Sequence, residues 1–161
     1  MRNAIAAVAL LFAASSLAAD PVYLDQLMER SLSTLQQQFP GLRKDGCYRI
    51  GADQYLLIDI DRKAQKPWRV VVTSLQPCRR PEDADTMDVR ERREISLGQR
   101  TTEVLERLGR PDAAAPPEPS LRRLGETEYF FICRVSEGCA RHTSVFSRDG
   151  IVTAIAEWYS Q

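Results

Sequence analysis

The feature that most constrains the fold is the dipeptide Asp149-Gly150, which separates two runs of strand-forming residues. A two-residue type I′ turn needs positive φ at both central positions, and Asp-Gly meets this need. The flanking runs, Arg141–Arg148 and Ile151–Tyr159, are rich in residues that favour strands. The sequence therefore predicts an antiparallel hairpin over residues 141–159.

Further strands are expected upstream of this hairpin. Runs with alternating or β-branched residues at Cys47–Ile50, Tyr55–Asp61 and Trp68–Leu75 predict a first group of three strands. The strand-like runs Leu121–Leu124 and Glu128–Arg134 predict that a second group leads into the hairpin. The loop at 113–119 between the groups is rich in Pro and Ala.

Two helices are expected, one before each group of strands. The first should run from Asp20 to Phe39, because Asp is a good N-cap and apolar residues recur at steps of three and four. Those apolar residues are Leu24, Leu27, Met28, Leu32, Leu35 and Phe39. A shorter second helix should be capped by Thr101 or Thr102 and end at a glycine followed by a proline. Residues 77–94 predict a solvated linker, or a short helix with self-paired charges.

This order of elements predicts an α+β fold, with helices packed on one face of an antiparallel sheet. A first α–β unit with its charged connector covers residues 20–94, and a second covers residues 95–161. We expect the two units to form one compact domain. Their similar lengths suggest two tandem α–β-meander units, although no exact repeat is visible.

Residues 1–19 have the composition of a cleavable secretory signal. One positive charge precedes the apolar run Ala4–Ala14, and small residues follow up to Ala19. The run is shorter than the roughly 20 residues that a membrane-spanning helix needs. We expect cleavage after Ala19, with Ala18 as the alternative, and a protein that is soluble in the periplasm or secreted. No cysteine stands at the cleavage point, which argues against a lipid-anchored N-terminus.

The chain has four cysteines, which in an exported protein predict two disulfides. Of the three pairings we favour Cys47–Cys78 with Cys133–Cys139, because each pair then lies within one half of the chain. No C-x-x-C motif indicates redox catalysis, and the ligands for a zinc site are not in close pairs. We expect neither a metal nor another cofactor.

Composition and motifs favour binding over catalysis. Lys plus Arg and Asp plus Glu both number 22, so the chain has no global charge that would attract nucleic acid or an anionic membrane. His142 is the only histidine, and neither a nucleophile elbow nor a phosphate-binding glycine loop is present. We therefore expect a protein that is not an enzyme. A carboxylate pair for hydrolysis needs only proximity in space, and the sequence does not test it.

Residues 95–159 resemble a known family of envelope proteins. The stretch Ile95–Pro111 contains a glycine, a capping threonine, Glu-Val and Leu-Gly-x-Pro, and Val145–Val152 is similar to the family's terminal hairpin. This pattern resembles the SmpA/OmlA-like outer-membrane assembly family, which shares its fold with β-lactamase-inhibitor-protein-like domains. The resemblance implies helices layered on an antiparallel sheet and periplasmic proteins that act by binding other proteins. Unlike typical members of the assembly family, this chain has no cysteine for acylation.

The hairpin register predicts a candidate partner-binding face. Counting outward from the turn places His142 opposite Glu157, and we expect Phe130 to pair with His142 on the next strand. The residues expected on this face are Phe130, Ile132, His142, Phe146, Ile155, Glu157 and Tyr159. The opposite face, with Val145, Val152, Ala154, Ala156 and Trp158, is expected to be core. Alternatively, the N-terminal unit covers the candidate face.

The leading hypothesis is an exported protein-binding factor: an inhibitor, an immunity protein or an envelope-assembly accessory protein. Its partner would be another envelope or secreted protein. An alternative is a module that binds a small ligand or an envelope glycan in a pocket between the two units. A third candidate is a hydrolase that uses a carboxylate pair.

Overall fold

The computed structural model describes residues 20–132 and 141–159. Its first helical region consists of two short helices, α1 (Leu24–Glu29) and α2 (Leu32–Gln38), and the prediction of one continuous helix is wrong. The backbone is extended at Arg30 and Ser31, between the two helices. The Ser31 hydroxyl accepts a hydrogen bond from the Thr34 backbone N–H, so a new N-cap starts α2.

The predicted cap at Asp20 is also wrong, because Tyr23 is the N-cap of α1. A two-residue strand, β1 (Val22–Tyr23), precedes the helix and pairs in parallel with β6 (Val89–Arg90). The apolar stripe is nevertheless confirmed as core. All six of its residues are buried: Leu24, Leu27, Met28, Leu32, Leu35 and Phe39.

The three predicted strands of the first unit are confirmed as β2 (Asp45–Gly51), β3 (Gln54–Asp61) and β4 (Lys66–Thr73). The connector that follows contains β6 and a further short strand, β5 (Glu82–Asp83), which pairs in parallel with β2. It contains no helix, and buried Met87 ties it to the core, so it is more than a solvated linker.

The second unit begins with α3 (Thr101–Leu108), which ends at Gly109 as predicted. The N-cap is Arg100, and not either threonine. A short strand, β7 (Ala113–Ala115), lies in the predicted Pro/Ala-rich loop. The predicted strand at residues 121–124 is wrong, because Leu121 and Leu124 lie in consecutive turns.

The remaining strands are β8 (Thr127–Ile132), β9 (Arg141–Arg148) and β10 (Ile151–Tyr159), which correspond to the last three predictions. The Asp149-Gly150 turn between β9 and β10 is confirmed, with φ of 52° and 73° at its two residues. Arg148 pairs with Ile151 beside it, as predicted.

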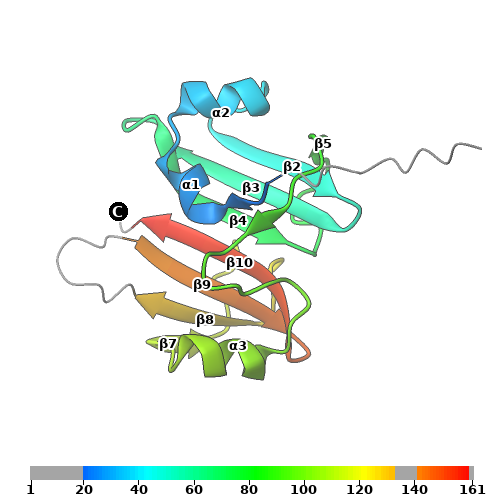
Figure 1. Cartoon of the computed structure of the whole chain (residues 1–161), viewed down its shortest axis with the longest axis vertical. Helices are drawn as coiled ribbons and strands as arrows, with labels where there is room; N and C mark the ends of the chain where they lie inside the picture. Colours follow the sequence, from blue (N-terminus) through cyan, green and yellow to red (C-terminus); the bar gives the residue numbers. More distant parts are fainter. Residues whose placement is uncertain (1–19, 133–140, 160–161) are drawn as a thin grey trace, which may run out of the picture.

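Eight strands form one sheet in the order β5-β2-β3-β4-β10-β9-β8-β7 (Figure 1). The β4–β10 pair joins the strands of the two units, and the order of the second unit mirrors that of the first about this pair. Helix α1 packs against β4 and β10, and Val104 of α3 belongs to the same hydrophobic cluster. The α+β fold, with helices on an antiparallel sheet, is confirmed. We call the helix-covered side of the sheet the front face and the other side the back face.

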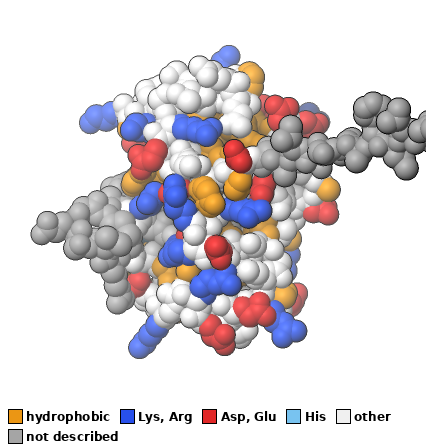
Figure 2. Space-filling view, in the orientation of Figure 1, with side chains coloured by type: hydrophobic (Ala, Val, Ile, Leu, Met, Phe, Trp, Pro, Cys, Tyr) orange, Lys and Arg blue, Asp and Glu red, His pale blue; other side chains and the backbone are white. Residues whose placement is uncertain are grey.

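The Cys47–Cys78 disulfide is confirmed and links β2 to the segment after β4. The second predicted pair, Cys133 and Cys139, lies outside the described residues. Within the described part of the chain, none of the helices has the length and apolar character needed to cross a membrane. Figure 2 shows basic and acidic side chains interspersed on one side of the molecule, with hydrophobic side chains in small groups between them.

Candidate functional site

The hairpin that carries the predicted partner-binding residues contains a β-bulge, which changes its register. The pairing of β10 with β9 shifts between Val152 and Ala154. His142 therefore lies opposite Trp158, and the predicted pairing with Glu157 is wrong. Because strand side chains alternate between the two faces, a shift of one residue moves every later β10 side chain to the opposite face.

The predicted face is consequently divided between both sides of the sheet. Four of its residues lie on the back face: Phe130, Ile132, His142 and Phe146. The other three lie on the front face, beneath or beside α1: Ile155, Glu157 and Tyr159. The prediction of a single binding face from these seven residues is therefore wrong. Trp158, which we expected on the core face, lies on the back face against Phe130.

One row of residues crosses the back face in register over six strands. Successive Cα partners along it, from β8 to β2, are Ile132, His142, Trp158, Arg69, Asp59 and Asp45. Directly paired residues in an antiparallel sheet point to the same face, so these side chains form one continuous line. The line is apolar and aromatic at its β8 end and charged at its β2 end.

The apolar end of this row forms a cluster with Phe130, and we call Phe130, Ile132, His142 and Trp158 the back-face strip. The Phe130 ring lies 5.1 Å from the His142 ring and 5.8 Å from the Trp158 ring, centroid to centroid. Phe130 itself pairs with Ser144, two residues away from the predicted pairing with His142. The Ile132 side chain is 45% exposed, whereas the three rings are half-buried. Tilted and edge-to-face arrangements of this kind are the ones that aromatic rings prefer.

A turn segment covers the back face next to the strip. Leu121 and Leu124 pack there against Phe146, Ala154 and Ala156. Phe146 is only 1% exposed, so this predicted contact residue is a core residue. The turn segment with Leu121 and Leu124 covers the middle of the back face and leaves Ile132, at the end of β8, exposed.

An ion pair continues the row beyond Trp158. Both the Nε and Nη2 atoms of Arg69 lie 2.6 Å from the Asp59 carboxylate, and both side chains are mostly buried. Burial raises the pKa of Asp59 above its ordinary value, although the Arg69 charge acts in the opposite direction. The Arg69 guanidinium also lies over the Trp68 ring, 4.6 Å from its centroid.

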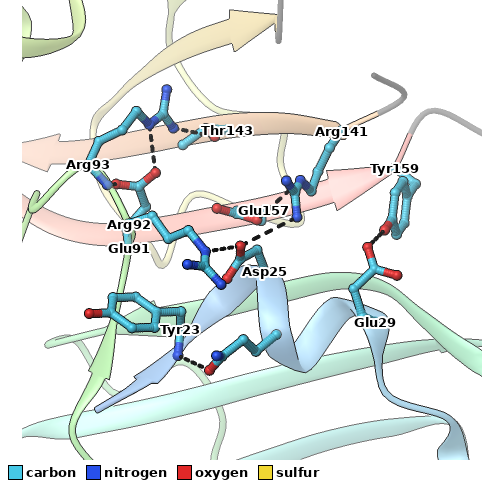
Figure 3. A network of polar contacts seen from close by, with 11 residues as sticks. Tyr23, Asp25, Glu29, Glu91, Arg92, Arg93, Arg141, Thr143, Glu157 and Tyr159 are labelled. Carbon is cyan, nitrogen blue, oxygen red and sulfur yellow. Dashed lines mark hydrogen bonds and ion pairs between the residues drawn. The ribbon is translucent and has the colours of Figure 1, made fainter. Parts of the chain in front are cut away.

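The front face carries a different set of charges, between α1, the connector and the last two strands (Figure 3). The Asp25 carboxylate of α1 accepts a hydrogen bond from Arg92 Nε and lies 3.8 Å from Arg141 Nη1. Glu157 Oε2 lies 3.8 Å from Arg141 Nε and makes no hydrogen bond to any described residue. Arg141 therefore bridges a carboxylate of the first unit and one of the second.

Three further pairs of residues extend this network on the front face. Glu91 of the connector, 3% exposed, accepts hydrogen bonds of 2.6 Å from both the backbone N–H and the Nε of Arg93. Arg93 also donates to the Thr143 hydroxyl on β9. The Tyr159 hydroxyl donates to Glu29 of α1 at 2.7 Å. The Arg93–Thr143 contact joins the connector to β9, and the Tyr159–Glu29 contact joins α1 to β10.

This arrangement brings three poorly exposed carboxylates, Asp25, Glu91 and Glu157, into one region. Burial is the main cause that raises the pKa of Glu157, to about 7, and the nearby charges of Glu91 and Asp25 add to it. Two of the three carboxylates accept hydrogen bonds from arginine, and no group of metal-ligating side chains occurs in the described ranges 20–132 and 141–159. The network therefore joins the two units by ion pairs. It also contains one buried carboxylate, Glu157, whose charged form is disfavoured.

Sequence reasoning missed Trp158 and Trp68, two half-buried tryptophans, as candidate site residues. The strand pattern put Trp158 on the core face because nothing in the local sequence marks a bulge at residue 153. Trp68 is likewise the unpaired extra residue of a bulge, since Asp59 pairs with Arg69 but Ile60 pairs with Pro67. Both side chains are half-buried, and the face on which Trp158 lies is known only from the strand register.

No protein-family model, curated protein or solved structure matches this chain. The resemblance of residues 95–159 to the SmpA/OmlA-like family stays a prediction.

Proposed function

We propose that this chain is an exported protein-binding factor that contacts its partner through the back-face strip. The single observation that carries the proposal is the in-register row that places Ile132, His142 and Trp158 side by side on the back face, joined by Phe130. Aromatic residues concentrate in the energetic centres of protein–protein interfaces, where they fill pockets of the partner.

The preorganisation of the strip supports this role. The rings pack against one another on three neighbouring strands, so binding would immobilise few rotatable bonds. Arg69 and Asp59 beside the rings provide a charged margin of fixed geometry. An apolar centre with a polar margin is the usual composition of a protein interface.

Two features support export. Residues 1–19 have the order of a secretory signal, and the Cys47–Cys78 disulfide is of the kind that persists in oxidising compartments. The inhibitor, immunity and assembly roles all require such a protein to meet another envelope or secreted protein. The partner's chemistry would be an apolar protrusion that seats on the rings.

A site-specific photo-cross-linker tests the proposal. The cross-linking residue is placed at position 132 of the full chain, expressed in its own envelope with the disulfide formed. Position 151 is the matched control, because Ile151 is the second exposed large hydrophobic among the described residues, at 38%. It lies at the opposite end of β10 from the strip, beside the turn.

We expect a discrete adduct from position 132 that is absent at position 151 and is lost when Phe130→Ala is added. Adducts of equal yield at both positions, or an adduct at 132 that persists in the Phe130→Ala protein, would contradict a role for the strip. Capture of a partner alone would not show that the strip binds it. The test is the difference in adduct yield between positions 132 and 151.

A further inference from the structure

A groove lies at the turn end of the β3–β4 hairpin, and Tyr159, the residue after Trp158 of the back-face strip, completes its lining. It encloses about 720 Å³, within the range of small-ligand sites. Ile60 and Pro67, both buried, form its apolar floor. Trp68 of the first unit and Tyr159 of the second form two aromatic walls, so the groove lies where the two halves of the chain meet.

Each aromatic wall is held in place by its own contacts. Trp68 is the extra residue of the β-bulge, a device that often redirects a side chain next to a functional site. The Arg69 guanidinium lies over its ring and is itself fixed by the pair of contacts to Asp59. The Tyr159 hydroxyl donates to Glu29 of α1.

The rim of the groove is positively charged. Arg62 and Lys66 line it from the hairpin turn, and both are exposed. Neither side chain forms an ion pair with any residue in the described part of the chain. Asp61 also lines the groove, and its Oδ1 accepts hydrogen bonds from the Lys63 and Ala64 backbone N–H groups, which holds the turn in shape.

We propose that this groove binds an acidic sugar unit, a pyranose ring that carries a carboxylate. The apolar C–H face of such a ring stacks on Trp68, as aromatic side chains offer a flat apolar surface. Its carboxylate meets Arg62 and Lys66, which have no competing partner. Its hydroxyls reach the remaining oxygen of Asp61. A neutral sugar would leave both cations unused, and a purely aromatic acid would leave Asp61 without a donor.

The experiment measures Trp68 fluorescence in the Trp158→Phe protein, because the chain has two tryptophans and this change leaves only Trp68. The probes are trigalacturonic acid, neutral maltotriose and benzoate. We expect a saturable change with trigalacturonic acid only. Lys66→Gln should weaken this binding about tenfold, as expected for a lost charged hydrogen bond. High salt should weaken it as well.

Lys63→Gln is the matched control, because Lys63 is an exposed lysine of the same turn that does not line the groove. We expect it to leave the affinity unchanged. If Trp158→Phe does not fold, calorimetric titration of the Lys66→Gln and Lys63→Gln proteins, each with Trp158 intact, gives the same comparison. Equal binding of maltotriose, binding of benzoate alone, no binding, or equal effects of the two lysine changes would each overturn the proposal. None of these results bears on the back-face strip.

Discussion

Replacing Glu157 by Gln should make the protein more stable at alkaline pH and remove a pH dependence of its folding. Glu157 is 5% exposed on the front face, and burial raises its pKa from 4.5 to about 7. The Arg141 Nε atom, at 3.8 Å, is too distant to compensate by a hydrogen bond. Gln has the shape of the protonated side chain but never carries the charge.

The magnitude follows from the two pKa values. Each unit of difference between the folded and unfolded pKa corresponds to about 1.4 kcal/mol, so a rise from 4.5 to about 7 corresponds to about 3–4 kcal/mol. Because the folded state binds the proton more tightly, the stability conferred by the protonated Glu157 is complete below about pH 4.5. It is lost as the pH rises through about 7.

The assay is chemical unfolding of the wild-type and Glu157→Gln proteins at about pH 4 and about pH 8. We expect the stability of the variant relative to wild type to rise by about 3 kcal/mol between the two conditions. Glu106→Gln, at an exposed position of α3, is the control and should show no such rise. The reasoning is refuted if the relative stability of Glu157→Gln stays constant with pH, or if it falls because Arg141 stabilises the charged form.

Three further predictions concern stability, each measured by chemical or thermal unfolding. Cys47→Ser removes the disulfide between Cys47 and Cys78, two residues separated by 31 positions. The free energy of unfolding should fall by about 3–4 kcal/mol. Gly150→Ala places a side chain at φ of 73° and should cost about 1 kcal/mol. Arg69→Ala leaves the mostly buried Asp59 carboxylate without its partner and should cost about 3 kcal/mol, with a larger loss at high pH than at low pH.

Controls separate these effects from general damage to the strands. Gly51→Ala should be nearly neutral, because Gly51 has no positive φ and an added Cβ would meet its neighbours at 3.5 Å or more. A cost as large as that of Gly150→Ala would contradict the backbone explanation. Cys78→Ser opens the same disulfide and should match Cys47→Ser. Restoration of stability in Arg69→Ala by Asp59→Asn would support the pairing argument.

The division of the predicted first helix into α1 and α2 shows a limit of hydrophobic periodicity, which does not locate breaks within a helix. The apolar stripe from Leu24 to Phe39 has helical spacing, and all of it is buried. The spacing does not reveal that Arg30 and Ser31 are extended, because the apolar residues keep their positions across the break. Ser31 as an N-cap was the available signal, since its hydroxyl can replace a lost helical hydrogen bond.

The register error has a tertiary cause. The Asp149-Gly150 turn and the Arg148–Ile151 pair follow from local sequence, and both are confirmed. The bulge that follows is held by contacts of Thr153 with distant segments. Its carbonyl accepts from the Ser74 backbone N–H at 2.9 Å, and its hydroxyl donates to the Leu124 carbonyl at 2.6 Å. No local pattern shows such partners.

Because of this register error, the predicted partner-binding face contained both correctly and incorrectly placed residues. Phe130, Ile132 and His142 lie on one face as predicted. Their pairing differs from the predicted one by two residues, and a difference of two keeps each side chain on its face. The β10 residues were assigned to the wrong face. The strip was therefore predictable except for Trp158, and the front-face network of Figure 3 was not predictable at all.

The central claim is that the back-face strip binds a protein partner, and the affinity of that complex tests it most directly. The dissociation constant is measured by calorimetry for the partner identified through cross-linking at position 132. A charge placed in the centre of an apolar contact should weaken binding at least about thirtyfold in Ile132→Asp. The matched Ile151→Asp protein should bind like wild type. Equal affinities of the two variants for the partner would contradict the claim.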